Sequence, residues 1–325
     1  MTHAIPTYQD IENAQQRIQP HINKTPVFTS RFFNELTQAE IFFKCENFQR
    51  VGAFKIRGAT NAVFQLTEDE LKNGVVTHSS GNHAQALALA AKMRNAKAYI
   101  VMPDNAPSVK VNAVRGYGGE IIFCKNNPKE RHENAERISR ETGAILIPPY
   151  DHPHIIAGQG TAAKELIEET GKLDFIFAPI GGGGLMSGTS IASRHLCPQI
   201  EVIGCEPTNA NDAAQSLQTG ILQPALPQNT IADGLLTSLS ELTFAIIQKN
   251  VSEIVTVDEP EIIQAMKWVW ERMKIIIEPS SAVAVAALLK TSDQIKGKRA
   301  GVILTGGNVE FGKMVELFSQ LSPKN

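Results

Sequence analysis

The segment Gln49-Arg50-Val51-Gly52-Ala53-Phe54-Lys55-Ile56-Arg57-Gly58-Ala59 is the most informative stretch of this chain. It places Lys55 directly after small residues and one aromatic residue. A lysine acts as an amine nucleophile or base near neutral pH only when it is largely removed from water. Taken alone, the segment is more typical of a solvated surface lysine, so its meaning depends on the motifs that follow.

A run of four glycines, Gly181-Gly182-Gly183-Gly184, follows a strand-like run and precedes a helix-like run. Consecutive glycines let the backbone approach an anion closely, and a helix N-terminus adds partial positive charge, so phosphate is a natural ligand. No Lys-Ser or Lys-Thr pair follows, and the register does not match G-x-G-x-x-G. These differences argue against a Walker loop and a dinucleotide fingerprint, and they leave a tight structural turn as the alternative.

Two further turns carry polar groups. Ser79-Ser80-Gly81-Asn82-His83 offers backbone N–H groups that could bind a carboxylate, although Ser and Asn are also the usual helix caps. Thr305-Gly306-Gly307-Asn308 offers a hydroxyl that could face a ring nitrogen. A lysine able to form an imine, a donor-rich turn, a phosphate loop and a polar partner for a ring nitrogen together indicate pyridoxal phosphate (PLP).

Glu206 and Asp212 place two carboxylates six residues apart in a segment that we expect to be a loop. Oxygen ligands of this kind, helped by backbone carbonyls, suit Mg²⁺ or Ca²⁺. On spacing alone, a solvated acidic loop is the commoner explanation.

The composition is that of an ordinary globular protein, with 325 residues, 31 basic and 33 acidic residues, and 42% hydrophobic residues. This charge balance gives no electrostatic footprint for nucleic acid or for an acidic membrane. We find no apolar run long enough for a membrane span and no signal peptide, and the four cysteines form no Cys-x-x-Cys pair. We therefore expect a cytoplasmic protein with reduced thiols.

Short β-branched runs alternate with longer amphipathic runs, which predicts an α/β fold with two open, twisted, mostly parallel sheets flanked by helices. A compact block of such units, residues 74–151, is predicted to form a small domain. This domain is inserted into a large domain made of residues 1–73 and 152–325. We expect the site in the cleft between them, because open α/β sheets bind ligands beyond the carboxyl ends of their strands.

Taken together, these motifs resemble the PLP-dependent fold type II family, whose fold is like that of the tryptophan synthase β chain. The resemblance is to the branch of serine racemases and serine/threonine dehydratases, which includes threo-3-hydroxyaspartate ammonia-lyases. It runs from about residue 11 to about residue 317. The matching segments are Phe48 to Ala59, Ser79-Ser80-Gly81-Asn82-His83-Ala84-Gln85-Ala86, Ile156-Ala157-Gly158-Gln159-Gly160-Thr161, the four glycines, Glu278-Pro279-Ser280 and Gly306-Gly307-Asn308-Val309.

The resemblance implies that Lys55 holds PLP as a Schiff base and acts as the catalytic base. Phe54 is then expected to pack near the ring, Asn82 to contact the 3-hydroxyl, and Thr305 to face the pyridine nitrogen. The remaining cofactor-binding residues that it implies are Gly181, Gly182, Gly183, Gly184 and Leu185, which bind the phosphate, and Glu278.

The resemblance also implies roles in substrate and metal binding. Ser80 matches a second catalytic residue, on the side of the substrate Cα opposite the lysine. Apart from the resemblance, Arg131 and His132, at the start of a helix-like run, are candidates for binding the second carboxylate of threo-3-hydroxyaspartate, with a solvated helix face as the alternative. The expected substrate-binding set is Ser79, Ser80, Gly81, Asn82, His83 and Arg131. The expected ligands of a divalent cation (Mg²⁺, with Ca²⁺ and Mn²⁺ as alternatives) are Glu206, the Ala210 carbonyl and Asp212.

The function that the resemblance implies is dehydration and deamination of L-serine, L-threonine or threo-3-hydroxyaspartate to a keto acid and ammonia. The main alternative is a serine or aspartate racemase that uses Lys55 and Ser80 on opposite faces of Cα. A remote alternative is a non-catalytic amino-acid-binding protein. A homodimer is expected, with a small amino acid as substrate and with no nucleic acid or membrane partner.

Overall fold

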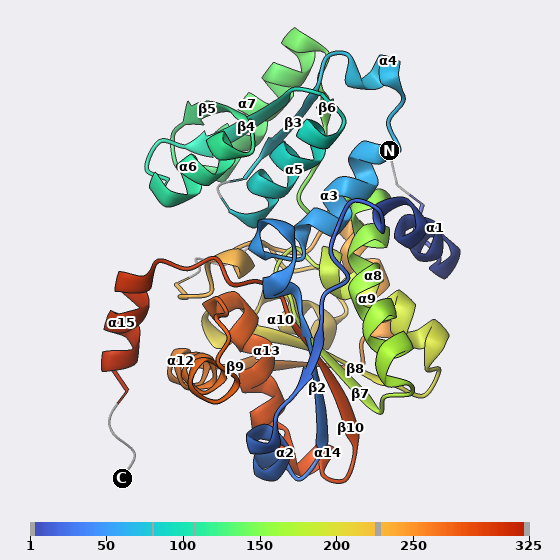
Figure 1. The fold of residues 1–325 in the computed structure, drawn as a ribbon, viewed down its shortest axis with the longest axis vertical. Helices are drawn as coiled ribbons and strands as arrows, with labels where there is room; N and C mark the ends of the chain where they lie inside the picture. Colours follow the sequence, from blue (N-terminus) through green and yellow to red (C-terminus); the bar gives the residue numbers. More distant parts are fainter. Residues whose placement is uncertain (1–3, 80, 107, 225–228, 322–325) are drawn as a thin grey trace.

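The computed structural model describes residues 4–79, 81–106, 108–224 and 229–321, and it contains two separate β-sheets (Figure 1). The larger sheet has the strand order β1-β2-β10-β7-β8-β9, and the smaller has the order β5-β4-β3-β6. All neighbouring strands run parallel except β1 and β2. The prediction of an α/β fold with two mostly parallel sheets is confirmed.

The strands match the β-branched runs of the sequence closely. In the six-stranded sheet they are β1 (Val27–Thr29), β2 (Glu40–Cys45), β7 (Phe175–Pro179), β8 (Glu201–Pro207), β9 (Glu253–Val257) and β10 (Arg299–Leu304). In the four-stranded sheet they are β3 (Val75–His78), β4 (Ala98–Pro103), β5 (Glu120–Cys124) and β6 (Ile145–Leu146).

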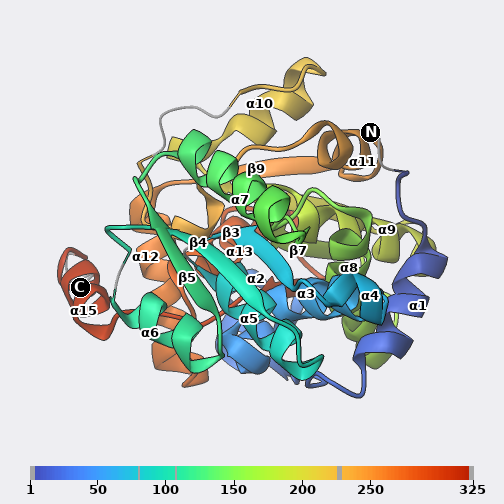
Figure 2. The ribbon, with the colours of Figure 1, turned by 90° about the horizontal axis from the view of Figure 1, so that it is seen from above.

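The four-stranded sheet and three helices form a unit that we call the four-stranded block, residues 75–146. Helices α5 (Asn82–Met93) and α6 (Ser108–Gly116) cover one face of this sheet, and α7 (Pro128–Thr142) covers the other (Figure 2). The rest of the described chain is called the six-stranded block. All strands of the smaller sheet fall inside the predicted small domain, although the domain boundaries at 74 and 151 stay a prediction.

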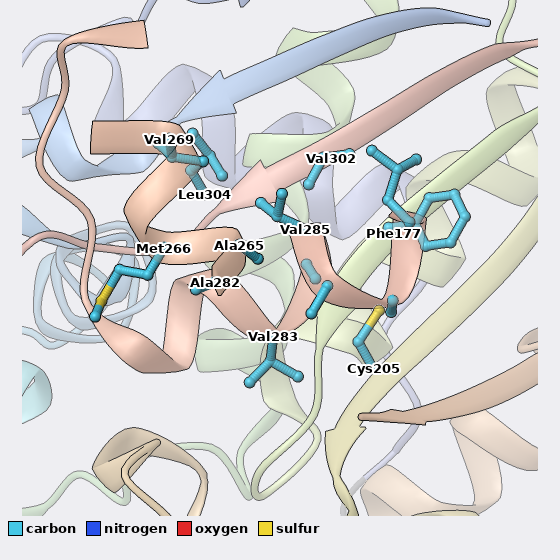
Figure 3. Packing of buried hydrophobic residues seen from close by; sticks show 14 of the residues in the cluster. Phe177, Cys205, Ala265, Met266, Val269, Ala282, Val283, Val285, Val302 and Leu304 are labelled. Atoms are coloured by element: carbon cyan, nitrogen blue, oxygen red, sulfur yellow. The ribbon is translucent and has the colours of Figure 1, made fainter. Parts of the chain in front are cut away.

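Helices cover both faces of the six-stranded sheet. On one face α8 (Pro153–Thr170) and α9 (Gly184–Leu196) pack on the strands. On the other face α13 (Pro279–Lys290) packs on the strands, and α12 (Glu259–Trp268) packs on α13. Figure 3 shows small and β-branched side chains of α13, such as Val283 and Val285, among those of β7 and β10. The other α-helices are α1 (Tyr8–Ile18), α2 (Arg31–Thr37), α3 (Lys55–Phe64), α4 (Glu68–Leu71), α10 (Asp212–Thr219), α11 (Glu241–Asn250), α14 (Ser292–Ile295) and α15 (Phe311–Ser319).

Five short helical segments complete the described elements: η1 (Glu46–Phe48), η2 (Arg50–Gly52), η3 (Thr208–Ala210), η4 (Asp233–Leu235) and the π-helical η5 (Val269–Met273). Among the described residues, no helix combines the length and the apolar character that crossing a bilayer requires.

The structure corrects the expected loop between the two acidic residues. Glu206 lies in strand β8, and Asp212 is the first residue of α10, so only the short η3 separates the two elements. Both side chains are buried, unlike those of a solvated loop. The sequence predicts a strand over Val202–Cys205, but the strand continues through Glu206 and Pro207, which pair with Thr256 and Val257 of β9.

A buried network of charges fixes α3 against the six-stranded sheet and α8. The Arg57 guanidinium contacts Glu46 at 2.7 Å and Glu165 at 2.8 Å, and Lys44 on β2 contacts Glu165 at 2.7 Å. Arg57 and Lys44 are fully buried. Although burial opposes the charged form, Arg57 and then Lys44 lower the pKa of the Glu165 carboxyl. Each buried charge therefore has a partner, which is the condition under which such a network is tolerated.

Replacing Arg57 with alanine is expected to destabilise the protein by about 3–5 kcal/mol, because it leaves Glu46 and Glu165 without their shared cation. The midpoint of urea unfolding measures this loss. Arg31→Ala is the matched control, since Arg31 pairs with Glu35 at 3.7 Å while 91% of its side chain is exposed. An exposed pair of this kind contributes under about 1 kcal/mol. Equal midpoints for the two variants would contradict the assignment.

Candidate active site

The carboxyl ends of strands from both sheets converge on one region. Strand β3 ends before the turn containing Ser79 and Gly81, β7 ends before the four glycines, and β10 ends before Thr305. Two side-chain contacts, Asn82 to Glu278 and Asn308 to Asn82, join these turns across the two blocks. This is the position where open α/β sheets bind ligands, and it is where the sequence placed the site.

Lys55 is the first residue of α3 and points into this region. Its ammonium nitrogen donates to the Pro149 carbonyl oxygen at 2.8 Å and lies 5.2 Å from the centre of the Phe54 ring. Burial lowers the pKa of Lys55 to about 8, even though the nearby Glu278 carboxylate acts in the opposite direction. At pH 7 about a tenth of the amine is therefore unprotonated, far more than for a solvated lysine, and this free amine is the form that acts as a nucleophile or base.

The backbone before Lys55 is attached to the turn that follows β10. The Phe54 N–H donates to the Thr305 carbonyl at 3.0 Å, and the Gly307 N–H donates to the Gly52 carbonyl at 3.0 Å. Val51 adopts a left-handed conformation with φ of 59°, which is uncommon for a β-branched residue. The Asn308 side chain donates to the Val51 carbonyl at 2.8 Å. Such strain persists only where surrounding contacts hold it, and it often marks a functional site.

The four glycines form the predicted turn between β7 and α9. Gly183 caps α9 with φ of 83°, in the left-handed region that favours glycine. A Cβ on Gly182 would lie 2.3 Å from ring carbons of Tyr150, so the ring packs directly on bare backbone. The first turn of α9 leaves N–H groups without intrahelical acceptors, and these suit an anion.

Asn82, Glu278 and Asn308 form a polar network beside Lys55. The Asn82 amide nitrogen donates to the two carboxylate oxygens of Glu278 at 2.9 and 3.2 Å, and its oxygen accepts from the Asn308 amide at 2.9 Å. Burial and then Asp233 raise the pKa of Glu278 to about 7, against the effects of Asn82 and Lys110. The network therefore contains a carboxyl group that titrates near neutral pH.

The expected substrate turn is described only in part, since Ser80 lies outside the described residues. The Gly81 N–H donates to the Ser79 hydroxyl at 3.3 Å, and Ser79 and Gly81 are half-buried. The His83 ring is buried, and its Nε2 lies 3.3 Å from the Ile147 carbonyl oxygen. Burial, followed by Lys55, lowers the pKa of His83 to about 3, so the ring is neutral.

Arg131 lies in the first turns of α7, near the end of β3. Its guanidinium makes no hydrogen bond or ion pair with any residue that the structure describes, and its Nε is buried. The rings of His78 and His132 meet edge to face with centres 5.6 Å apart. Burial, then His132 and Arg131, lower the pKa of His78 to about 4. A half-buried cation without a counter-charge thus lies next to the substrate turn.

A family model described as "Pyridoxal-phosphate dependent enzyme" matches residues 18–306. The chain belongs to this family. It is 48% identical over 316 residues to the L-threo-3-hydroxyaspartate ammonia-lyase of Saccharomyces cerevisiae, covering 97% of both chains. It is 50% identical over 317 residues to the serine racemase of Dictyostelium discoideum, covering 96% of this chain and 98% of that one. The structure of maize serine racemase superposes with a TM-score of 0.93 at 41% identity and covers 98% of each chain.

The residues of this pyridoxal-phosphate dependent enzyme fit the cofactor. Lys55 supplies a buried amine, and the glycine turn supplies a helix N-terminus for the phosphate. Thr305 is buried, and its hydroxyl makes no hydrogen bond with the described residues, so it is available to a ring nitrogen. Phe54 lies beside the lysine, and Leu185 lies in the first turn of α9.

The two expected metal-binding carboxylates of the enzyme lie close together. Glu206 accepts from the Ala213 N–H at 3.2 Å and the Ala214 N–H at 2.7 Å. Burial raises the pKa of Glu206 to about 8, and the neighbouring Asp212 adds to the effect. Across the described ranges, no three His, Cys, Asp or Glu side chains gather into a metal-binding group. A cation here would need backbone or water ligands, such as the Ala210 carbonyl.

Two contributors to the site were not identified from the sequence. Tyr150 packs on the glycine turn, and the carbonyl of Pro149 accepts from Lys55. Both lie just after β6, where no motif is present. Asn308 belongs to a quoted motif, but its contacts with Val51 and Asn82 depend on the distant pairing of β10 with β2.

Proposed function

We propose that this protein is a PLP-dependent ammonia-lyase that converts a small β-hydroxy amino acid to a keto acid and ammonia. The observation that carries the proposal is the buried Lys55 amine with a pKa of about 8, which lies between the glycine turn and the Asn82–Glu278 network. The relatives named above include an ammonia-lyase that matches almost the whole chain. When bound, PLP supplies the electron sink that acidifies the Cα–H bond of an amino acid.

Each residue of the site would have a defined task. Lys55 would attach the cofactor and, once freed by the incoming amine, take the proton from Cα. The glycine turn and Leu185 would hold the phosphate, Thr305 the ring nitrogen, and Asn82 the ring hydroxyl. The Ser79 hydroxyl, with the N–H groups of Ser80, Gly81, Asn82 and His83, would bind the substrate carboxylate, because the Ser79 N–H already donates to the Val101 carbonyl. A neutral hydroxyl partner need not protonate the ring nitrogen, which favours prompt loss of the β-substituent over a long-lived carbanion.

Among the three expected substrates, we propose threo-3-hydroxyaspartate. The support is Arg131, a half-buried guanidinium without a counter-charge near the substrate turn. A charge in this setting costs free energy unless a ligand supplies its partner. Serine and threonine carry no second carboxylate, whereas hydroxyaspartate does.

Racemisation is the second candidate function, because relatives that match most of this chain are named serine racemase. Ser80 would supply the second acid or base. One assay separates the two functions: the holoenzyme is incubated with L-serine, D-serine, L-threonine and L-threo-3-hydroxyaspartate, and both keto acid and enantiomer composition are measured. Keto acid without enantiomer exchange supports the lyase, and exchange that outruns keto acid supports the racemase.

We also propose that Glu206, the Ala210 carbonyl and Asp212 bind a divalent cation, with Mg²⁺ as the first choice. Two buried carboxylates that carry like charges and repel each other would be stabilised by a cation between them.

The resemblance further implies a homodimer and a cytoplasmic location. Phe28 and Phe48 are exposed and contact each other edge to face at 5.8 Å, and exposed aromatic side chains of this kind are frequent in subunit interfaces.

Lys55→Ala is expected to lower keto acid formation by at least about 1,000-fold, because it removes the base and the covalent attachment point. Borohydride reduction followed by peptide mass spectrometry should detect no attached cofactor. Lys24→Ala removes a lysine that pairs with Glu169 at 3.4 Å on the surface, and it should behave as wild type. Wild-type turnover in the Lys55 variant would refute the proposed function.

Arg131→Ala is expected to lower kcat/KM for threo-3-hydroxyaspartate by about 10- to 100-fold, with little change for L-serine, since it removes a charged hydrogen bond to the second carboxylate. Arg137→Ala is the control, because Arg137 lies on the same helix and pairs with Glu141 at 2.7 Å. If both substrates lose activity equally in the Arg131 variant, Arg131 does not determine specificity.

Chelation with EDTA is expected to lower the thermal unfolding temperature, and added Mg²⁺ should restore it. Because a cation binds only the ionised carboxylate, its affinity should rise as the pH increases towards about 8, the pKa of Glu206. Asp212→Asn, which removes one ligand and the charge repulsion together, should make the protein insensitive to EDTA. An unchanged unfolding temperature in the wild type would argue against the site.

A further inference from the structure

Two polar contacts connect the four-stranded block to the same part of the six-stranded block. Asn82, at the start of α5, donates to Glu278, and Lys110 on α6 forms an ion pair with Asp233 of η4 at 2.5 Å. In both contacts the donor belongs to the four-stranded block and the carboxylate to the six-stranded block. Together with the packing of α5 on α3 and the Asn308–Asn82 contact, these two contacts bring a pair of neighbouring carboxylates to the boundary between the blocks.

A local contact holds these two carboxylates at a fixed separation. The N–H of Gly234, which follows Asp233, donates to the Ser280 hydroxyl at 2.9 Å. Ser280 lies in the first turn of α13, two residues after its N-cap residue Glu278. The Gly234–Ser280 contact thus holds Asp233 near Glu278. A change of charge at Asp233 therefore changes the pKa of Glu278 through space.

Glu278 faces charged or polar groups from every element around it. These are Lys55 from α3, Asn82 from α5, Lys110 from α6, Asp233 from η4 and Asn308 from the turn after β10. Asp233 favours the protonated carboxyl, whereas Lys110 and Asn82 favour the ionised one. Glu278 in turn favours the protonated amine of Lys55. The Lys110–Asp233 pair thus acts on Lys55 through Glu278.

We propose that Lys110 and Asp233 are positioning residues of the active site, whose ion pair sets the charge of Glu278 when the two blocks meet. With Lys110 in contact, its charge favours the ionised form of Glu278, in which both oxygens accept from Asn82. Without the Lys110 charge the protonated form of Glu278 is favoured, and the proton, taken from water, removes one acceptor oxygen from the contact with Asn82. Contact between the blocks and ionisation of Glu278 therefore stabilise each other.

A purely structural salt bridge makes a different prediction from this electrostatic role. Loss of either partner would then weaken the same contact and change the site in the same direction. In the electrostatic role the signs differ. Lys110→Gln removes a positive charge and raises the pKa of Glu278, while Asp233→Asn removes a negative charge and lowers it.

The test compares wild type, Lys110→Gln, Asp233→Asn and the double variant by two measurements. The first is the acidic limb of the pH profile of kcat/KM for ammonia release by the holoenzyme. The second is the titration midpoint of the Glu278 carboxyl, followed by NMR of protein labelled with ¹³C-glutamate and assigned with Glu278→Gln. Lys290→Gln is the control, since Lys290 pairs with Glu261 at 3.3 Å outside the contact between the blocks.

Lys110→Gln is expected to move both midpoints up by about half a pH unit or more, and Asp233→Asn to move them down. The two midpoints of the double variant should lie near those of wild type, and the midpoints of Lys290→Gln should equal those of wild type. Because Asp233 is half exposed, the shifts should shrink in about 0.5 M salt. Shifts of the same sign in the two single variants, or no shifts, overturn the inference.

The activity measurement rests on the proposed function. If no substrate releases ammonia, that function fails, while the carboxyl titration still decides the role of the ion pair.

Discussion

The buried contact of Arg57 with Glu46 and Glu165 is the constraint on which the site depends. It fixes α3 between β2 and α8, and α3 begins with Lys55. The backbone just before α3 is held to the turn after β10. Because both attachments are inside the protein, the lysine amine is held away from bulk water, and its lowered pKa follows from that position.

The active site then depends on convergence between segments that are distant in sequence. Lys55, the glycine turn, Glu278 and the Thr305 turn all belong to the six-stranded block, while Asn82 and Arg131 belong to the four-stranded block. The polar network around Glu278 joins the two sets. The pKa of Glu278 depends on the contact with Asn82, and the pKa of Lys55 depends on Glu278. A change in the geometry of the network therefore also changes the protonation of these two groups.

Features of this arrangement that depend on local sequence could be predicted, whereas features that depend on burial or on contacts between distant segments could not. The strands and the glycine turn were predictable, because β-branched runs and consecutive glycines act locally. Helix α3 was not, since Arg57, Thr60 and Asn61 are buried and remove its amphipathic pattern. The burial of Glu206 and Asp212 was also missed, because it depends on α10 folding over the end of β8. The Tyr150 contact has no local signal at all.

Tyr150 has a consequence for the anion site as well as for packing. It follows the last strand of the four-stranded block; its ring lies on Gly182, while its Cβ and backbone lie against Gly184. Because these glycines lack a Cβ, Tyr150 comes closer to the turn than it could beside any other residue. The missing side chains that leave room for an anion on the turn therefore also set the position of Tyr150. A Cβ at Gly182 or Gly184 would disturb the anion site and the packing of Tyr150 together.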